Sequence, residues 1–103
     1  MHYQTIIKLQ EAYGFKDMQD KINSGMAWKL EGSYGREAMR LLESGACMLP
    51  KESSRDYYGN RIPSRDEVAQ GSKGSFQNCV KFWEGVEDGT IEIYPEAEFE
   101  DFE

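Results

Sequence analysis

The residues best suited to chemistry lie between positions 55 and 65, where basic and aromatic side chains are densest. They are Arg55, Tyr57, Tyr58, Arg61 and Arg65. Guanidinium groups bind phosphates and tyrosine rings stack on bases, so the stretch suits a single-stranded nucleic acid. Asp56, Asp66 and Glu67 lie in the same stretch and weaken that interpretation. Two others therefore stay open: a surface that contacts a protein, and tyrosines that cover a thin core.

A loop rich in glycine and serine, residues 71–75, precedes an apolar helical pattern. Glycines ahead of a helix, together with Lys73 and Ser75, can hold an anion on backbone amides. The spacing does not match a phosphate-binding loop, which needs four residues between its glycines before the lysine. A flexible connector with Ser75 as the helix cap is the main interpretation, and an anion site is the alternative.

Acidic charge is concentrated at the C-terminus. The first 84 residues hold 12 basic and 11 acidic groups, whereas residues 85–103 hold eight acids and no base. Within the last eight positions the acids alternate with phenylalanines, giving Glu96, Glu98, Phe99, Glu100, Asp101 and Phe102. Acids attract a basic surface over a distance and aromatic rings anchor it, so we expect this tail to bind a partner. Covering the protein's own body and keeping it in solution are the alternatives.

No catalytic or metal-binding set stands out in the sequence. Zinc sites need clustered cysteine and histidine, but the chain has only His2, Cys47 and Cys79, all far apart. A nucleophilic cysteine would need a nearby base, and the two cysteines stand among apolar residues. We therefore expect no enzymatic activity, no metal and no cofactor, with both thiols buried and reduced.

The chain has 103 residues, a net charge of −7 and 39% apolar residues, which suits one small domain with a thin core. We expect that domain over residues 1–95 and the acidic aromatic tail over 96–103. The tail should be disordered in the free protein, because its few apolar groups cannot offset the entropy of ordering. The N-terminus has no signal-peptide pattern, and the longest apolar run, residues 45–50, is too short to span a bilayer. These features predict a cytoplasmic protein without membrane contact.

The apolar spacing predicts helices over 3–13 and 16–23, separated by Gly14. A further helical pattern runs over 24–45, with Ser24 as its cap and two glycines inside, as one helix or two. A short helical turn at 64–67 and a helix from Ser75 to Gly85 complete the helices. The predicted core includes Leu30, Tyr34, Leu41, Trp83 and Ile93.

Strands are predicted at 46–49 and 90–94, ending at Pro50 and Pro95, with a third near 56–62. The predicted fold class is α+β: a helical N-terminal half packed on one face of a two- to three-stranded antiparallel sheet, followed by the disordered acidic tail.

Two functional hypotheses follow. The first is a non-enzymatic macromolecule-binding protein, an inhibitor or regulator, whose acidic surface engages a basic protein partner as a nucleic-acid mimic would. The second is a nucleic-acid-binding module whose Arg/Tyr surface is shielded by its own acidic tail. The small size, the thin core rich in Met and aromatic residues and the lack of a catalytic set resemble, in composition, phage and plasmid accessory proteins. Either function is compatible with a homodimer.

Overall fold

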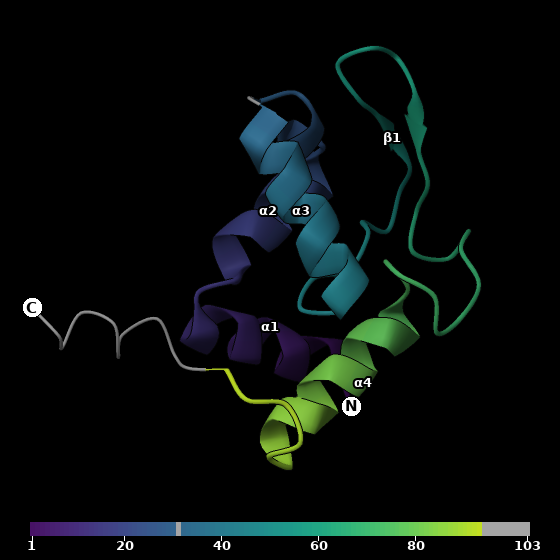
Figure 1. The fold of residues 1–103 in the computed structure, drawn as a ribbon. Helices are drawn as coiled ribbons and strands as arrows, with labels where there is room; N and C mark the ends of the chain where they lie inside the picture. The colour runs from purple at the N-terminus through teal and green to yellow at the C-terminus, as the bar shows by residue number, and fades with distance from the viewer. Residues whose placement is uncertain (31, 94–103) are drawn as a thin grey trace, which may run out of the picture.

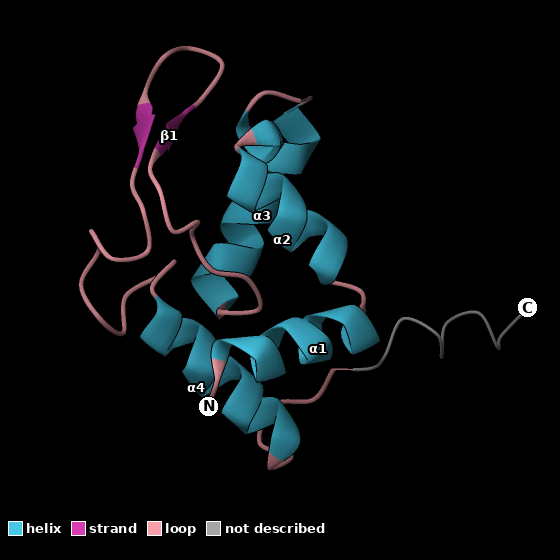
Figure 2. Cartoon of the chain, turned by 180° about the vertical axis from the view of Figure 1, so that it is seen from behind, coloured by secondary structure: helices cyan, strands magenta, loops and turns pink. Residues whose placement is uncertain are grey.

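The structure, a computed structural model, describes residues 1–30 and 32–93. Helices, a 3-10 turn and a small antiparallel sheet follow one another as α1 (Tyr3–Tyr13), α2 (Lys16–Ser24), η1 (Met26–Trp28), α3 (Gly32–Ser44), β1 (Ser54–Arg55), β2 (Arg61–Ile62) and α4 (Phe76–Glu87). Helices α2 and α3 stand above α1 and α4, and the β1–β2 hairpin projects beside α3 (Figures 1 and 2). The predicted combination of helices with a small antiparallel sheet is thus confirmed.

The first two helices form where the sequence predicts them. Helix α1 ends at Gly14, whose φ of 86° is a left-handed conformation that a residue with a side chain rarely adopts. Helix α2 runs one residue past its predicted end. Ser24 is therefore its last residue, and not the cap of the next helix.

The segment 24–45 is divided into a 3-10 turn and a helix. Gly25, with φ of 83°, ends α2, and α3 begins only at Gly32. Because α2 ends at Ser24 and α3 begins only at Gly32, the predicted apolar stripe does not lie along one helix. Leu30 and Tyr34 are consequently 39% and 38% exposed, so their placement in the core was wrong.

The remaining core predictions fare better. Leu41 is 4% exposed and Trp83 is fully buried, as predicted, and Ile93 is partly buried against the core. The Trp83 ring meets three other rings, with centroid distances of 5.0 to 5.9 Å to Tyr13, Phe15 and Phe82. These contacts join the two ends of the chain, because α1 and α4 pack together around this indole.

Neither of the two main predicted strands forms. Residues 46–49 are buried and non-helical but pair with no strand, and residues 90–93 likewise lie outside any sheet. In the second segment Ile91 folds back onto α4, donating its amide to the carbonyl of Gly85 at 2.9 Å. A Cβ on Gly85 would lie 2.6 Å from the Ile91 side chain, so this glycine allows the close contact and does not end the helix.

Among the described residues, the sheet is confined to a hairpin, and the strand predicted near 56–62 falls mainly on its turn, with only Arg61 and Ile62 in β2. Ser54 pairs with Ile62 and Arg55 with Arg61 in an antiparallel register. Two residues per strand are too few to form a platform for the helices. The predicted packing of a helical half on a sheet face is therefore replaced by helices packed around the buried segment 46–49.

Glutamine side chains take the place of strand partners for this segment. Gln10 Nε2 donates to the Ala46 carbonyl at 2.9 Å and to Gln19 Oε1 at 2.8 Å. Gln19 Nε2 donates to the Met48 carbonyl at 2.9 Å, and its Oε1 accepts the Met48 amide at 3.0 Å. Both glutamines are fully buried. Buried peptide groups need partners, and here side chains from α1 and α2 supply them.

Beyond the hairpin, residues 64–67 form a turn, in which the Glu67 amide donates to the Ser64 carbonyl at 3.1 Å, but no helix. Ser75 caps α4 as predicted, and its Oγ accepts the Asn78 amide at 3.0 Å. After α4, Asp88 and Gly89 form a turn, in which the Asp88 carboxylate accepts the Thr90 amide at 2.9 Å.

The glutamine network gives a first prediction. Replacing Gln19 by Met keeps the side-chain volume but leaves the Met48 amide and carbonyl buried without partners. We expect the free energy of unfolding to fall by about 2–4 kcal/mol, since each unsatisfied buried group costs about 1–3 kcal/mol. Gln4→Met, at an exposed position of α1, is the matched control and should change it by less than about 0.5 kcal/mol. Equal effects in urea unfolding would contradict the role of Gln19.

The two leucines on either side of the broken stripe give a second prediction. Leu41→Ala should lower the free energy of unfolding by about 2–5 kcal/mol, because it opens a cavity in the core. Leu30→Ala should cost less than about 1 kcal/mol, because this side chain is already half exposed. Thermal or chemical denaturation of both variants measures the difference, and a larger loss for Leu30→Ala than for Leu41→Ala would contradict this prediction.

Candidate functional site

The most exposed large apolar side chains are two adjacent tyrosines at the tip of the hairpin. Tyr57 is 74% exposed and Tyr58 is 84% exposed. Their rings meet edge to face, with centroids 5.3 Å apart. Two rings held together in solvent form a contact surface that the core does not use.

Asp56 holds the hairpin tip in one conformation. Its Oδ1 accepts the amides of Tyr58 at 2.9 Å and of Asn60 at 2.8 Å, and its Oδ2 accepts the Asn60 side chain at 3.2 Å. Partial desolvation opposes the charged form, but the hydrogen bonds from Asn60 and Tyr58 outweigh it and lower the pKa of Asp56. Arg55 closes the other side by donating Nη1 to the Gly59 carbonyl at 2.8 Å.

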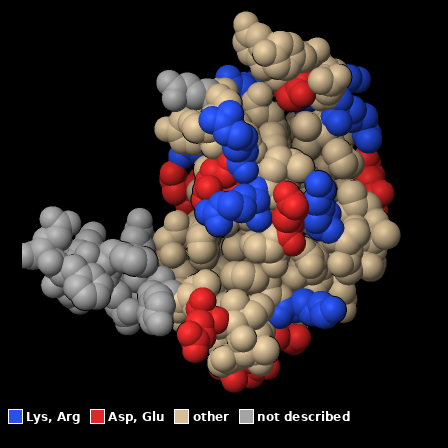
Figure 3. Space-filling model, viewed as in Figure 1, with Lys and Arg blue, Asp and Glu red and all other residues tan. Residues whose placement is uncertain are grey.

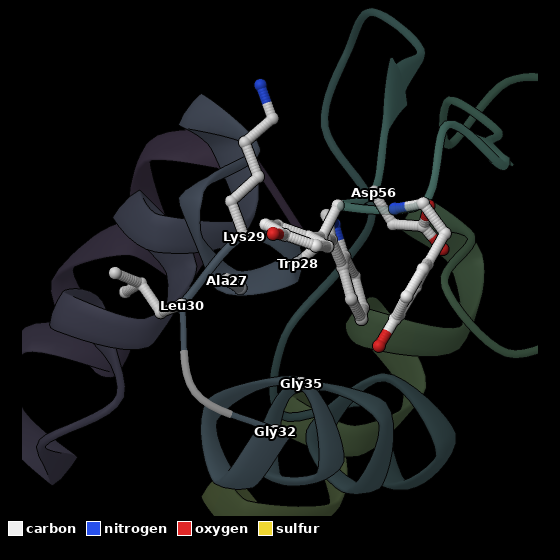
Figure 4. A pocket seen from close by; sticks show the side chains of 9 residues that line it. Ala27, Trp28, Lys29, Leu30, Gly32, Gly35 and Asp56 are labelled. Carbon is white, nitrogen blue, oxygen red and sulfur yellow. The ribbon is translucent and has the colours of Figure 1, made fainter.

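A cleft of about 380 Å³ separates the hairpin tip from η1 and the start of α3 (Figure 4). We call it the tip cleft. Its lining comprises Ala27, Trp28, Lys29, Leu30, Gly32, Gly35, Asp56, Tyr57 and Tyr58. The hairpin is joined to η1 here, since the Tyr57 amide donates to the Trp28 carbonyl at 3.2 Å. Trp28 Nε1 is buried and has no hydrogen-bond acceptor among residues 1–30 and 32–93.

The basic residues predicted for this surface divide between two places. Arg55 and Arg61 lie on the hairpin with the tyrosines, and Arg61 pairs with Glu67 at 2.5 Å. Arg65 lies elsewhere, over the Tyr3 ring at 5.2 Å, with its Nε donating to the Leu49 carbonyl at 2.9 Å. The structure thus brings four of the five predicted residues together and leaves Arg65 beside a second cleft.

The remaining predicted positions have other surroundings. Ser75 is fully buried, and its Oγ accepts the amides of Gly71 at 3.1 Å and Asn78 at 3.0 Å, while Lys73 is exposed. An anion bound to this loop would therefore contact Lys73 but could not reach the buried Ser75 hydroxyl. The six tail residues predicted to bind a partner, Glu96 to Phe102, lie outside the described residues, as does the predicted disorder of 96–103.

The two cysteines are buried and unbridged. Burial raises the pKa of Cys79 to about 12 and raises that of Cys47 further. Both thiols are therefore protonated at neutral pH and poor nucleophiles. Among residues 1–30 and 32–93, no group of three or more His, Cys, Asp or Glu could hold a metal ion, and no helix could cross a membrane.

Charge on the folded part is mixed. Basic and acidic side chains lie next to one another on the face seen in Figure 3. In the described part of the chain, three ion pairs lie within a helix, including Lys16 with Asp20 at 2.8 Å and Arg40 with Glu37 at 2.5 Å. Part of the positive charge is thus balanced locally.

A family described as a domain of unknown function (DUF7417) matches residues 8–55, less than half of the chain. No curated protein and no solved structure matches the chain. The matched range contains Gln10, Gln19 and the segment 46–49, and it ends before Tyr57. The similarity thus covers the glutamine network and one wall of the tip cleft.

Sequence reasoning found the tyrosines but missed the opposite wall of the tip cleft. Trp28 falls outside the apolar stripe of the predicted helix over 24–45, and Lys29 belongs to no sequence motif that indicates a site. The signal that could have found them is Gly25: a left-handed glycine here starts a separate turn, which directs these residues toward the hairpin.

The hairpin gives a third prediction. Asp56→Ala should release the tip, because the amides of Tyr58 and Asn60 lose their acceptor, while the helices keep their stability. In the unaltered protein the tip should loosen in the same way in acid. The pKa of Asp56 is lower in the folded protein than the value near 3.8 of the unfolded chain, so the charged carboxylate stabilises the folded tip above pH 3.8. This stabilisation is lost as the pH falls through the pKa of the folded state. Amide exchange at residues 58 and 60 measures both effects, and unchanged protection in Asp56→Ala would refute the role of the carboxylate.

Proposed function

We propose that this protein is a non-enzymatic macromolecule-binding accessory protein, an inhibitor or regulator, that engages a partner protein with a basic surface. The observation that carries the proposal is the pair Tyr57 and Tyr58, 74% and 84% exposed on a hairpin held by Asp56. Exposed rings on a fixed turn lose little entropy on binding, and aromatic residues dominate the energetics of many interfaces.

The tip cleft supports a protein as the partner. It lies directly beside the tyrosines and has an apolar floor of Ala27 and Trp28. A side chain inserted there would contact Trp28 on one side and the hairpin on the other.

Acidic charge supplies attraction over a distance. Residues 85–103 hold eight acids and no base, so a basic partner approaches this end of the molecule preferentially. In the proposal, Phe99 and Phe102 then add apolar anchors to the encounter. An acid-rich segment of this kind competes with nucleic acid for the same basic surface, which suits an inhibitor that acts as a nucleic-acid mimic.

A second candidate function has one specific observation in its favour. The two exposed tyrosines share their hairpin with Arg55 and Arg61, a combination that can stack bases and bind phosphates. In this alternative the acidic tail shields the surface until nucleic acid displaces it. The pairing of Arg61 with Glu67 and the nearly neutral body argue for the protein partner instead.

Neither candidate function involves catalysis, and both suit the cytoplasm, where the two unbridged thiols would stay reduced. A homodimer is also compatible with them, since the hairpin tip of one copy could contact another.

The fourth prediction tests the proposal with two fluorescent probes, a peptide rich in Lys and Arg and a single-stranded oligonucleotide. We expect the full-length protein to bind the peptide, with an affinity that falls as salt rises. Tyr57→Ser/Tyr58→Ser should weaken this binding by about tenfold or more, as loss of an aromatic anchor does. Neutralising the tail by Glu96→Gln, Glu98→Gln, Glu100→Gln and Asp101→Asn should weaken it and reduce its salt dependence. Fluorescence anisotropy measures each affinity.

Tyr34→Ser is the matched control, because this half-exposed tyrosine does not line the tip cleft. Phe99→Ala/Phe102→Ala separates the aromatic contribution of the tail from its charge. Binding of the oligonucleotide that strengthens in the neutralised variant would favour the nucleic-acid function. Binding of neither probe would reject both functions in their present form.

A further inference from the structure

A second cleft, of about 560 Å³, lies where the start of α1 meets the chain after Pro50 and the start of α4. We call it the Arg65 cleft. Its lining comprises Tyr3, Lys51, Arg65, Asp66, Gln70 and Phe76. None of these residues lines the tip cleft, so the two clefts can be tested independently. The volume falls within the range of about 300–1,000 Å³ usual for small-molecule sites.

Backbone carbonyls and the Tyr3 ring hold the guanidinium group of Arg65 in place. The Arg65 amide donates to the Pro50 carbonyl and its Nε to the Leu49 carbonyl, both at 2.9 Å, while the guanidinium carbon lies 5.2 Å from the centre of the Tyr3 ring. These contacts leave the two terminal nitrogens, which form the fork that binds a carboxylate or phosphate.

Arg65 differs in this respect from Arg40 and Arg61. Those two arginines pair with Glu37 and Glu67, both at 2.5 Å. Arg65 is half buried, yet no described residue forms an ion pair with it. A partly desolvated cation in a fixed position, with free donors facing a cleft, is typical of an anion-binding site.

The other lining residues define which anion fits. Lys51 adds a second positive charge, and Asp66 a negative one, so the cleft carries a net charge of about +1. One negative charge on the ligand balances it, which favours a carboxylate over a doubly charged phosphate ester. The half-buried rings of Tyr3 and Phe76 provide an apolar surface for a flat group beside that carboxylate.

We propose that the Arg65 cleft binds an aromatic carboxylate, with the carboxylate on Arg65 and Lys51 and the ring against Phe76 and Tyr3. A free small molecule supplies this chemistry. The tail of this chain supplies it too, because glutamates stand beside Phe99 and Phe102.

The tail is long enough to reach the cleft. The described chain ends beside the C-terminal end of α1 in both Figures 1 and 2. Tyr3 begins the same helix, whose 11 residues span about 16 Å. The ten residues after Ile93 can extend over about 33 Å. The two sources therefore have to be separated by experiment.

The fifth prediction uses three probes on the full chain. N-acetylphenylalanine carries both the ring and the carboxylate, its amide carries only the ring, and acetate only the charge. We expect the first to bind about tenfold more tightly than either of the others, because only it can contact Arg65 and Phe76 together. Chemical-shift titration of backbone amides measures the affinities, and the shifts should be largest near Lys51, Arg65 and Phe76.

Variants then assign the contacts. Arg65→Gln and Lys51→Gln should each weaken binding of N-acetylphenylalanine by about tenfold, and Asp66→Asn should strengthen it because a repelling charge is removed. Lys81→Gln, at an exposed position on α4, is the matched control and should change nothing. Lys51 is exposed, so its variant remains folded and keeps the test valid if Arg65→Gln proves unstable.

Neutralising the acids of the tail distinguishes the two sources. A probe affinity that rises in this variant means that the tail occupies the cleft in the free protein, and an unchanged affinity means that the site takes a free ligand. Equal affinities for N-acetylphenylalanine and its amide, or an unchanged affinity in both Lys51→Gln and Arg65→Gln, would overturn the proposal. Tyr57→Ser/Tyr58→Ser should leave probe binding intact, so failure here is separate from failure of the proposed function.

Discussion

The fold depends on satisfying the peptide groups of one buried, non-helical segment, residues 46–49. A strand in that position would normally pair with another strand, but among residues 1–30 and 32–93 no strand lies beside it. Gln10 from α1, Gln19 from α2 and the indole of Trp83 from α4 provide the hydrogen bonds instead. Each bond is short, buried and directed, so the three helices are held in fixed positions around the segment. The glutamine side chains thus provide hydrogen bonds that a neighbouring strand would otherwise provide to this segment.

The same segment positions one of the two clefts but not the other. As the chain leaves it, the carbonyls of Leu49 and Pro50 accept the side chain and amide of Arg65, which fixes the second cleft against the core. The hairpin is attached differently, through the Trp28 carbonyl and through its own Asp56. Changes at the tip can therefore alter the exposed tyrosines without disturbing the helices.

The sequence predicts the helices well because apolar period and glycine position act locally. It cannot predict the path of 46–49. An apolar run before a proline has the same pattern whether its backbone bonds to a neighbouring strand or to two glutamine side chains. Gln10 lies on the apolar face of α1, yet nothing in its neighbours reveals a partner 36 residues away. Leu30 was misplaced for a related reason. The apolar stripe that included it assumes one continuous helix, but α2 ends at Ser24 and α3 begins at Gly32. Of the candidate site, the tyrosine turn was predictable, whereas the separation of Arg65 from Arg61 depends on tertiary contacts.

The distribution of paired and unpaired charge favours one of the two proposed functions over the other. Lys16, Lys21, Arg40 and Arg61 each pair with a neighbouring acid, which lowers the positive charge that these elements offer to a nucleic acid. Arg65 and Lys51 form no such pair among the described residues, and they face a cleft with aromatic walls. The body therefore has one exposed aromatic tip and one cleft that we propose as an anion site, while the excess acid lies in the last 19 residues. An arrangement with little net charge on the body and strong negative charge at one end attracts basic proteins more readily than phosphate backbones.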